Sequence, residues 1–376
     1  MTAPAAPPAR DRTDGAGRAG ATDDARAAVH EVARVRRAGR ARYLLVCVVL
    51  AVATVAVLCA SLAYGDMAVP LSDVVAALTR RADPATWFIV GELRMPRALM
   101  AILVGVAFGL SGAVFQSVLR NPLASPDVIG ISSGASVAAV LASSLFAVSG
   151  VLLSAFALAG AVLTGLLIYA LAWRRGVTGA RLVLVGIGIG AGLSSVVSYL
   201  MTRSEVTEAQ SALLWLTGSL NGRSWDLLRP LAWSLVVVLP LLFLAARQMP
   251  VLQLGDDTAA GLGGRTQRGR PALLACAVAL AGVATAAAGP VGFVAFVSAP
   301  VARRLAPGRG ASLVASGLTG ALLVLVADFA AQHVLDLVDL PAGSAGQLPV
   351  GIVTSVIGAP YLMWLLIRTN RAGRGG

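Results

Sequence analysis

The stretch "ALMAILVGVAFGLSGAVFQSVLRNPLASPDVIGISSGA", residues 98–135, joins an apolar run to a polar turn. Residues 98–115 contain no charged side chain, and a helix that crosses a bilayer needs about 20 predominantly apolar residues. Residues 120–130 then include an arginine, an asparagine and two prolines, and a proline interrupts the hydrogen bonds of a helix. The stretch therefore predicts a transmembrane helix that ends in an irregular turn.

The composition of the whole chain predicts the same class of protein. Of its 376 residues, 57% are hydrophobic and 13% are charged, and the mean hydropathy is +0.81. Soluble domains carry about 25% charged residues, so this chain groups with lipid-embedded proteins. We expect an all-α polytopic membrane protein of about ten transmembrane helices, with nine and eleven left open. The expected spans are 43–64, 95–117, 130–148, 151–172, 181–201, 230–246, 271–289, 290–305, 311–328 and 349–367.

Charge and composition divide the chain into three regions. Residues 1–42 are basic and poor in large apolar residues, which predicts a disordered cytoplasmic tail. Residues 43–368 form the expected transmembrane domain, and residues 369–376 form a cytoplasmic C-terminal tail. This topology places 23 of the 30 arginines on the cytoplasmic side and 7 on the opposite side. Without the N-terminal tail, 14 arginines are cytoplasmic and 7 lie on the opposite side. Because arginine favours the cytoplasmic side, we expect a multi-pass protein of the cytoplasmic membrane with both termini inside.

The residue types exclude several kinds of chemistry. All 30 basic residues are arginine, so the chain has no phosphate-binding loop and no Schiff-base lysine, both of which need lysine. The three cysteines lie in apolar segments and the two histidines are far apart in sequence, so we expect no metal, cofactor or catalytic site. The basic charge follows the membrane topology and builds no folded basic domain, so we expect no nucleic-acid partner.

Charged side chains are almost absent from the middle of the expected spans. A proton- or sodium-coupled carrier usually places ionisable residues there. If the chain is a transporter, its energy is therefore expected from a separate ATPase. An ion-coupled secondary carrier is the alternative, and uptake that persists after the ATPase is inactivated would favour it.

Three further stretches have two interpretations each. The glycine-rich segment 182–195 fits a relaxed dinucleotide fingerprint, but its apolar surroundings favour helix packing or pore lining. In "ELRMPR", residues 92–97, Arg94 and Arg97 are either interfacial anchors or an exposed cationic pair for an acidic partner. The insert 252–270 is either a connector or a docking surface whose short helix begins with Asp256 and Asp257.

The polar turn of residues 120–130 predicts what surrounds it. Pro122 and Pro126 forbid a continuous helix, and Asn121 can cap or turn the chain. Irregular backbone at membrane depth persists only against protein or a water-filled cavity. We therefore expect the turn to line or brace a pathway, while the hydroxyl residues after it either line the pathway or pack closely.

Six blocks in order resemble one family. They are "RMPRALMAILVGVAFGLSGAVFQSVLRNPLASPDVIGISSGA", "WLTGSL", "LGDDTAAGLG", "GPVGFVAFV", "ADFAAQ" and "QLPVGIVTSVIGAPYLMWLL". Together they resemble the FecCD family of ABC importer permeases, which carry ferric siderophores, haem or cobalamin. The resemblance runs from about Tyr43 to Arg368 and implies a type II importer permease of ten helices.

The resemblance also implies partners and cargo. We expect a second permease subunit, identical or paralogous, and a cytoplasmic ABC ATPase dimer that holds ATP-Mg. An extracytoplasmic substrate-binding protein would deliver a ferric siderophore, with haem or cobalamin as alternatives. The chain itself would bind no cofactor and would perform no hydrolysis.

The resemblance assigns expected roles to individual residues. "SAPVARR" departs from the family pattern at Pro300, although Arg303 is retained, and Gln332 stands where the family has a third docking arginine. The expected sites are binding-protein docking by Arg94, Arg97 and Gln332; ATPase coupling by Leu254, Gly255, Asp256, Asp257, Ala259, Leu262 and Gly263; and a pathway or gate formed by Gln116, Asn121, Pro122, Ser125, Pro126, Ser132, Ser133, Thr178 and Gly179.

Overall fold

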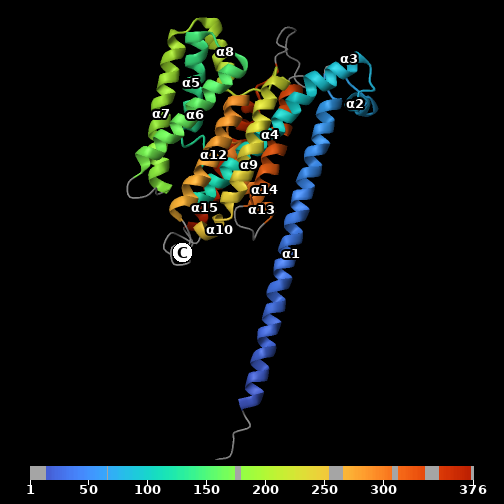
Figure 1. Cartoon of the computed structure of the whole chain (residues 1–376), viewed down its shortest axis with the longest axis vertical. Helices are drawn as coiled ribbons and strands as arrows, with labels where there is room; N and C mark the ends of the chain where they lie inside the picture. Colours follow the sequence, from blue (N-terminus) through green and yellow to red (C-terminus); the bar gives the residue numbers. More distant parts are fainter. Residues whose placement is uncertain are drawn as a thin grey trace, which may run out of the picture.

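The structure is a computed structural model and describes residues 14–65, 67–173, 179–253, 266–306, 312–334 and 347–373. The described part is built from helices joined by short connections (Figure 1). Each of the ten expected spans overlaps one helix. These helices are α1 (Asp14–Ala63), α4 (Met95–Val118), α5 (Ile131–Phe146), α6 (Gly150–Ala172), α7 (Gly179–Arg203), α9 (Trp225–Ala246), α12 (Thr266–Ala288), α13 (Val294–Leu305), α14 (Leu313–His333) and α15 (Val350–Gly373).

The helices confirm the all-α membrane architecture. In the described residues, seven helices are long and apolar enough to cross a membrane, and α5 and α15 contain shorter apolar segments. Helix α13 has only 12 residues, so it extends about 18 Å at 1.5 Å per residue and falls short of a hydrocarbon core about 30 Å thick. The expected span 290–305 therefore begins with non-helical chain, because Gly289 and Phe293 both adopt left-handed backbone conformations.

Short helices connect the long ones, and hydropathy did not predict them. They are α2 (Leu71–Leu78), α3 (Pro84–Trp87), the π-helical η1 (Phe88–Arg94), α8 (Val206–Leu216) and α10 (Met249–Gln253). Helix α3 begins at Asp83, whose carboxylate accepts a hydrogen bond of 3.0 Å from the Thr86 amide. Leu62, Val74 and Val90 form a small separate core beneath this connection. These contacts fix the path of the chain from α1 into α4.

The N-terminal region differs from the expected disordered tail. Residues 14–42 continue helix α1 beyond the bundle, as Figure 1 shows. Alanine and arginine are strong helix formers, and the segment is rich in both. Low hydrophobicity argues against a core within the segment, but it does not prevent a local helix. Its contact with the bundle includes a 3.3 Å hydrogen bond from Arg42 Nε to the Leu305 carbonyl oxygen.

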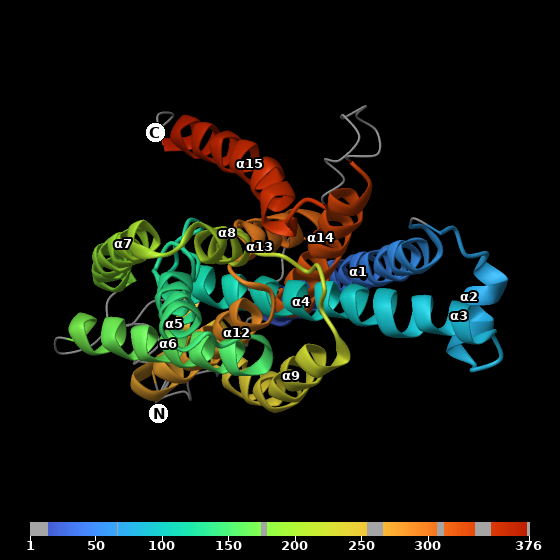
Figure 2. The same ribbon diagram turned by 90° about the horizontal axis from the view of Figure 1, so that it is seen from above.

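Helix α4 lies at the centre of the bundle, between α12, α13 and α14 (Figure 2). Small residues allow this close packing, because side chains added at Gly105 or Gly112 would collide with the backbones of α14 and α13. The Ser111 hydroxyl also donates a 2.7 Å hydrogen bond to the Ala277 carbonyl oxygen on α12. The "Arg97 end" and the "Asn121 end" below denote the ends of the bundle where α4 begins and where it ends.

Candidate functional site

A polar recess of about 470 Å³ lies at the Arg97 end. Its walls come from the start of α4, the end of α14 and the connection between α8 and α9. All three residues predicted to dock a binding protein, Arg94, Arg97 and Gln332, line it. The other polar and charged side chains of the recess are Ser61, Glu92, Asn221, Arg223, Ser224, Asp328, His333 and Gln347.

A buried ion pair closes the base of this recess. Arg97 Nη2 lies 2.9 Å from Asp328 Oδ1, and Arg97 Nε lies 3.1 Å from Asp328 Oδ2. The two side chains are only 12% and 3% exposed. Gln332 donates a 2.8 Å hydrogen bond to the same carboxylate, and Arg97 also donates to Gln347 Oε1. Asp328 therefore orients Arg97, and Gln332 supports the pair instead of adding a cation.

Arg94 is also engaged within the chain. Its guanidinium donates to the carbonyl oxygens of Leu62 at 2.8 Å and Met67 at 2.5 Å, which fixes the connection after α1. Arg94 and Arg97 are both half-buried, whereas the sequence suggested an exposed cationic pair. The difference arises because their acceptors lie about 30 and 230 residues away, beyond the reach of a local motif.

Arg223 is a third cation in the recess that the sequence did not single out. Its Nε donates a 3.1 Å hydrogen bond to the Ser219 carbonyl oxygen, within its own connection. Burial lowers the pKa of its guanidinium, because the charged form loses hydration there. Among the described residues, no carboxylate lies within 4 Å of it. Arg223 therefore adds a cation to the lining of the recess.

The Asn121 end holds a second polar site, a crevice of about 350 Å³. Gln116 donates a 3.0 Å hydrogen bond to the Phe296 carbonyl oxygen and accepts one of 2.6 Å from Arg303 Nη2. The amide thus joins α4 to both ends of α13. The crevice is lined by Gln116, Ser117, Arg120, Asn121, Pro122, Gln253 and Arg303. The sequence assigned no role to Arg303, because its partner Gln116 lies 187 residues away in the chain.

The turn after α4 has the irregular structure that its prolines predicted. Asn121 Oδ1 accepts a 2.9 Å hydrogen bond from the Leu123 amide, and the buried Ser125 hydroxyl accepts one of 3.3 Å from the Val128 amide. Pro126 is buried and Pro122 is exposed at the crevice. Gly130 then starts α5 in a left-handed conformation, and an added Cβ would lie only 2.9 Å from Gly190 on α7. The turn therefore packs against protein, as its depth requires.

Asp127 is the half-buried acid of this turn. Ser132 at the start of α5 donates a hydrogen bond to its Oδ1, while Oδ2 is buried without a hydrogen-bond partner among the described residues. Burial raises the pKa of Asp127 to about 6, although the Ser132 hydroxyl opposes that change. Ser132 thus occupies a packed position, whereas Ser133 is half-buried. Of the two hydroxyl residues, Ser133 is the more accessible.

The remaining predicted residues lie at the Asn121 end or outside the described part. Gly179 begins α7, where an added Cβ would lie 3.1 Å from the Leu119 carbonyl oxygen. Gln253, the last residue of α10, lines the crevice, so the predicted coupling segment starts directly beside it. Thr178 and the coupling residues Leu254, Gly255, Asp256, Asp257, Ala259, Leu262 and Gly263 lie outside the described residues.

Known proteins resemble this chain over nearly its full length. The ferric enterobactin transport system permease protein FepG of Escherichia coli is 40% identical over 330 residues, which cover 88% of this chain and 98% of that protein. The achromobactin transport system permease protein CbrC of Dickeya dadantii is 42% identical over 316 residues, covering 83% and 88%.

A solved structure supports the same relationship. A metal-chelate type ABC transporter in an inward-facing conformation matches with a TM-score of 0.73 and 26% identity, covering 86% of this chain and 99% of that one. The model of the FecCD transport family matches residues 52–368. The sequence blocks, the helical bundle and these similarities lead to one conclusion: the chain belongs to the FecCD transport family.

Proposed function

We propose that the chain is the membrane permease of an ABC importer that carries a ferric siderophore across the cytoplasmic membrane. The main observation in support is the 40% identity to a ferric enterobactin permease along 88% of the chain. Achromobactin and iron(3+)-hydroxamate permeases among the relatives support the same cargo class. Family members are permeases whose ATPase is a separate subunit, so this chain supplies the pathway and the partner supplies the energy.

The proposed orientation places the Asn121 end in the cytoplasm. Helix α1 starts and α15 ends at that side of the bundle in Figure 1, which supports a common compartment for the two ends of the chain. The excess of arginine at this end supports a cytoplasmic position. The Arg97 end then faces outward, where a substrate-binding protein arrives.

The recess at the Arg97 end is the proposed docking site for that binding protein. Acidic side chains on the partner would meet cations, and complementary charges speed and orient association. Asp328 already neutralises Arg97, so Arg97 acts mainly by holding the recess in shape. Arg94 and Arg223 line the recess, and Arg223 supplies the third cation that Gln332 cannot.

The crevice at the Asn121 end is the proposed coupling site. Leu254–Gly263 would sit on the ATPase dimer, which holds ATP-Mg. Movement of that segment reaches the crevice through Gln253, and from there it reaches α13 through the Gln116–Arg303 contact. The turn and the start of α7, with Thr178 and Gly179, would form the gate beside it.

Helices α7 and α15 form the proposed interface with a second permease subunit. Both lie at the edge of the bundle in Figure 2, and α7 buries only Leu182 and Gly186 among its described residues. Gly188 and Gly192, one turn apart on α7, have no atoms within 4 Å of the position of an added Cβ. A small-residue face of this kind lets a second membrane helix approach closely.

Uptake of radioactive iron tests the function. A strain that lacks this gene should lose uptake of one class of ferric siderophore, and restoring the gene should recover it. Haem, radiolabelled cobalamin and ferric citrate belong in the same panel. Loss of cobalamin or haem uptake, with every ferric siderophore unaffected, would contradict the proposed cargo.

A further inference from the structure

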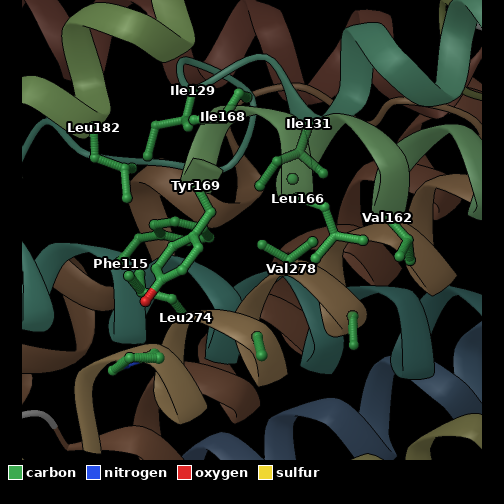
Figure 3. A pocket seen from close by; sticks show the side chains of 14 residues that line it. Phe115, Ile129, Ile131, Val162, Leu166, Ile168, Tyr169, Leu182, Leu274 and Val278 are labelled. Atoms are coloured by element: carbon green, nitrogen blue, oxygen red, sulfur yellow. The ribbon is translucent and has the colours of Figure 1, made fainter. Parts of the chain in front are cut away.

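An apolar groove of about 320 Å³ opens on the outside of the bundle and shares no lining residue with either polar site. Figure 3 shows that its side chains come from α4, the turn, α5, α6, α7 and α12. The deepest residues, Phe115, Ile129 and Ile131, are about 1% exposed, whereas Val162 and Leu166 at the mouth are 37% and 61% exposed. The groove therefore extends from the lipid-facing surface of α6 inward to the turn.

The groove has the chemistry of hydrocarbon. Among the described residues of the lining, Tyr169 carries the only side-chain polar group, and the others are apolar. A bound water needs two to four polar partners, so water is a poor occupant. An empty groove would forfeit dispersion contacts along its walls. A polar iron chelate would lose its hydration without gaining hydrogen bonds.

The shape and position of the groove suit a lipid chain. Helices α6 and α12, which border its mouth, are both candidate membrane spans, so a bilayer around the bundle would bring its hydrocarbon to the mouth. The lining residues on α12 run from Pro271 to Ala279, which corresponds to about 12 Å along the helix. An acyl chain is long, thin and flexible enough to enter such a groove from the side.

One end of the groove has the features of a membrane interface. Tyr169 lies 5.5 Å from Trp173 between ring centroids, and aromatic pairs of this type gather at the headgroup level. Arg181 and Arg270 directly precede the lining residues Leu182 and Pro271, at the ends of α7 and α12. Two cations at this end complement a negatively charged headgroup.

We propose that this groove binds one acyl chain of an anionic phospholipid, with its headgroup at the Asn121 end beside Arg181 and Arg270. The bound chain contacts Ile129 and Ile131, which flank Gly130 at the junction of the turn and α5. Gly130 in turn packs against Gly190 on α7. The lipid is thus a structural ligand that braces the proposed gate, and its binding does not depend on which chelate is carried.

Photo-crosslinking tests the site in the intact transporter. The permease and its ATPase are placed in nanodiscs that contain phosphatidylglycerol with a diazirine on the acyl chain, and labelled residues are mapped by mass spectrometry. We expect labelling at Val162, Leu166 and Val278 to exceed labelling at Leu163, an exposed residue of α6 outside the groove, by at least fivefold. Equal labelling would overturn the proposal.

A matched pair of variants provides the second readout. Ala275→Phe adds a ring to an exposed lining position, and Leu163→Phe adds a ring outside the groove. After a detergent wash, native mass spectrometry should find one phosphatidylglycerol retained by the wild type and by Leu163→Phe, and none retained by Ala275→Phe. Retention of lipid by Ala275→Phe would contradict the site.

The preference for an anionic headgroup is tested with the wild-type protein. Phosphatidylglycerol should be retained at least fivefold more than phosphatidylcholine with the same chains, because only phosphatidylglycerol carries net negative charge. Equal retention of the two would contradict the anionic headgroup, and retention of detergent or an apolar peptide in place of either lipid would overturn the proposal.

Discussion

An arginine side chain holds each end of helix α4, but the two arginines have different partners. At the Arg97 end the guanidinium meets the carboxylate of Asp328, and the two side chains are only 12% and 3% exposed. At the Asn121 end Arg303 meets the neutral amide of Gln116, and no described carboxylate pairs with it. Breaking a buried ion pair costs about 3–5 kcal/mol, whereas a hydrogen bond to a charged group contributes about 1.5–3 kcal/mol.

This difference assigns different mechanical roles to the two ends. The Arg97 end is a fixed support, because its charge is neutralised within the chain and its contacts are expensive to separate. The Asn121 end can rearrange at lower cost, which suits contact with a moving ATPase. Four predictions separate these roles, from the largest expected effect to the smallest.

Arg97→Leu should destabilise the protein most. The substitution leaves the Asp328 carboxylate buried without its cation, which costs about 3–5 kcal/mol. Thermal unfolding of the purified protein in one detergent measures the change. The double variant Arg97→Leu, Asp328→Leu should recover most of the loss, because it buries no unpaired charge. If the double variant were as unstable as Arg97→Leu alone, the Arg97–Asp328 ion pair would not be the support of this end.

Asp127→Asn should remove a pH dependence from the Asn121 end. The folded protein holds the Asp127 proton up to about pH 6, compared with an ordinary pKa of 3.8. The contribution of this group to stability is therefore fully present below about pH 4 and is lost as the pH rises through about 6. At 1.36 kcal/mol per pKa unit the loss is at most about 3 kcal/mol. Unfolding curves at pH 4 and pH 7 should differ less for the variant than for the wild type, and an unchanged difference would contradict this assignment.

Arg303→Leu should reduce transport more than stability. The variant removes the 2.6 Å contact with Gln116, worth about 1.5–3 kcal/mol, while ATP hydrolysis in the partner continues. Chelate transported per ATP hydrolysed, measured in proteoliposomes, should fall severalfold. Arg304→Leu is the matched control, because Arg304 stacks over the Trp364 ring at 3.9 Å instead of contacting Gln116. Equal losses in both variants would exclude a special role for Arg303.

Arg223→Glu should weaken docking without a comparable loss of stability. Its charge faces the recess and forms no described ion pair, so reversal should lower affinity for the binding protein about tenfold at low salt, or about 1.4 kcal/mol. The effect should shrink at high salt because ions screen exposed charges. Arg229→Glu, at an exposed arginine outside the recess, should change affinity much less. Equal losses of affinity in Arg223→Glu and Arg229→Glu would show that docking depends on the net charge of the permease and not on the position of Arg223.

Much of the fold could be predicted from the sequence, because hydropathy is a local property. Each expected span overlaps a helix, and the prolines predicted the break after α4. The short connecting helices were missed because they bury too few residues to produce an apolar run. The helical form of residues 14–42 was missed because composition reports on packing and not on local helix propensity.

The candidate sites were predicted as segments but not as contacts. The arginine motif before α4 and the polar turn after it both line polar sites in the structure. Their partners could not be read from one sequence, because Asp328 is 231 residues from Arg97 and Arg303 is 187 residues from Gln116. Arg223 carried no motif at all, and only the fold brings it to the recess.

Reconstituted transport tests the division of labour between this chain and its ATPase most directly. Proteoliposomes would contain the permease with or without the ATPase, with ATP inside and the binding protein loaded with ferric siderophore outside. We predict accumulation of iron only when the ATPase is present and can hydrolyse ATP, and no effect of collapsing a proton gradient. Accumulation by the permease alone, driven by a proton gradient, would contradict the proposed function and support an ion-coupled carrier.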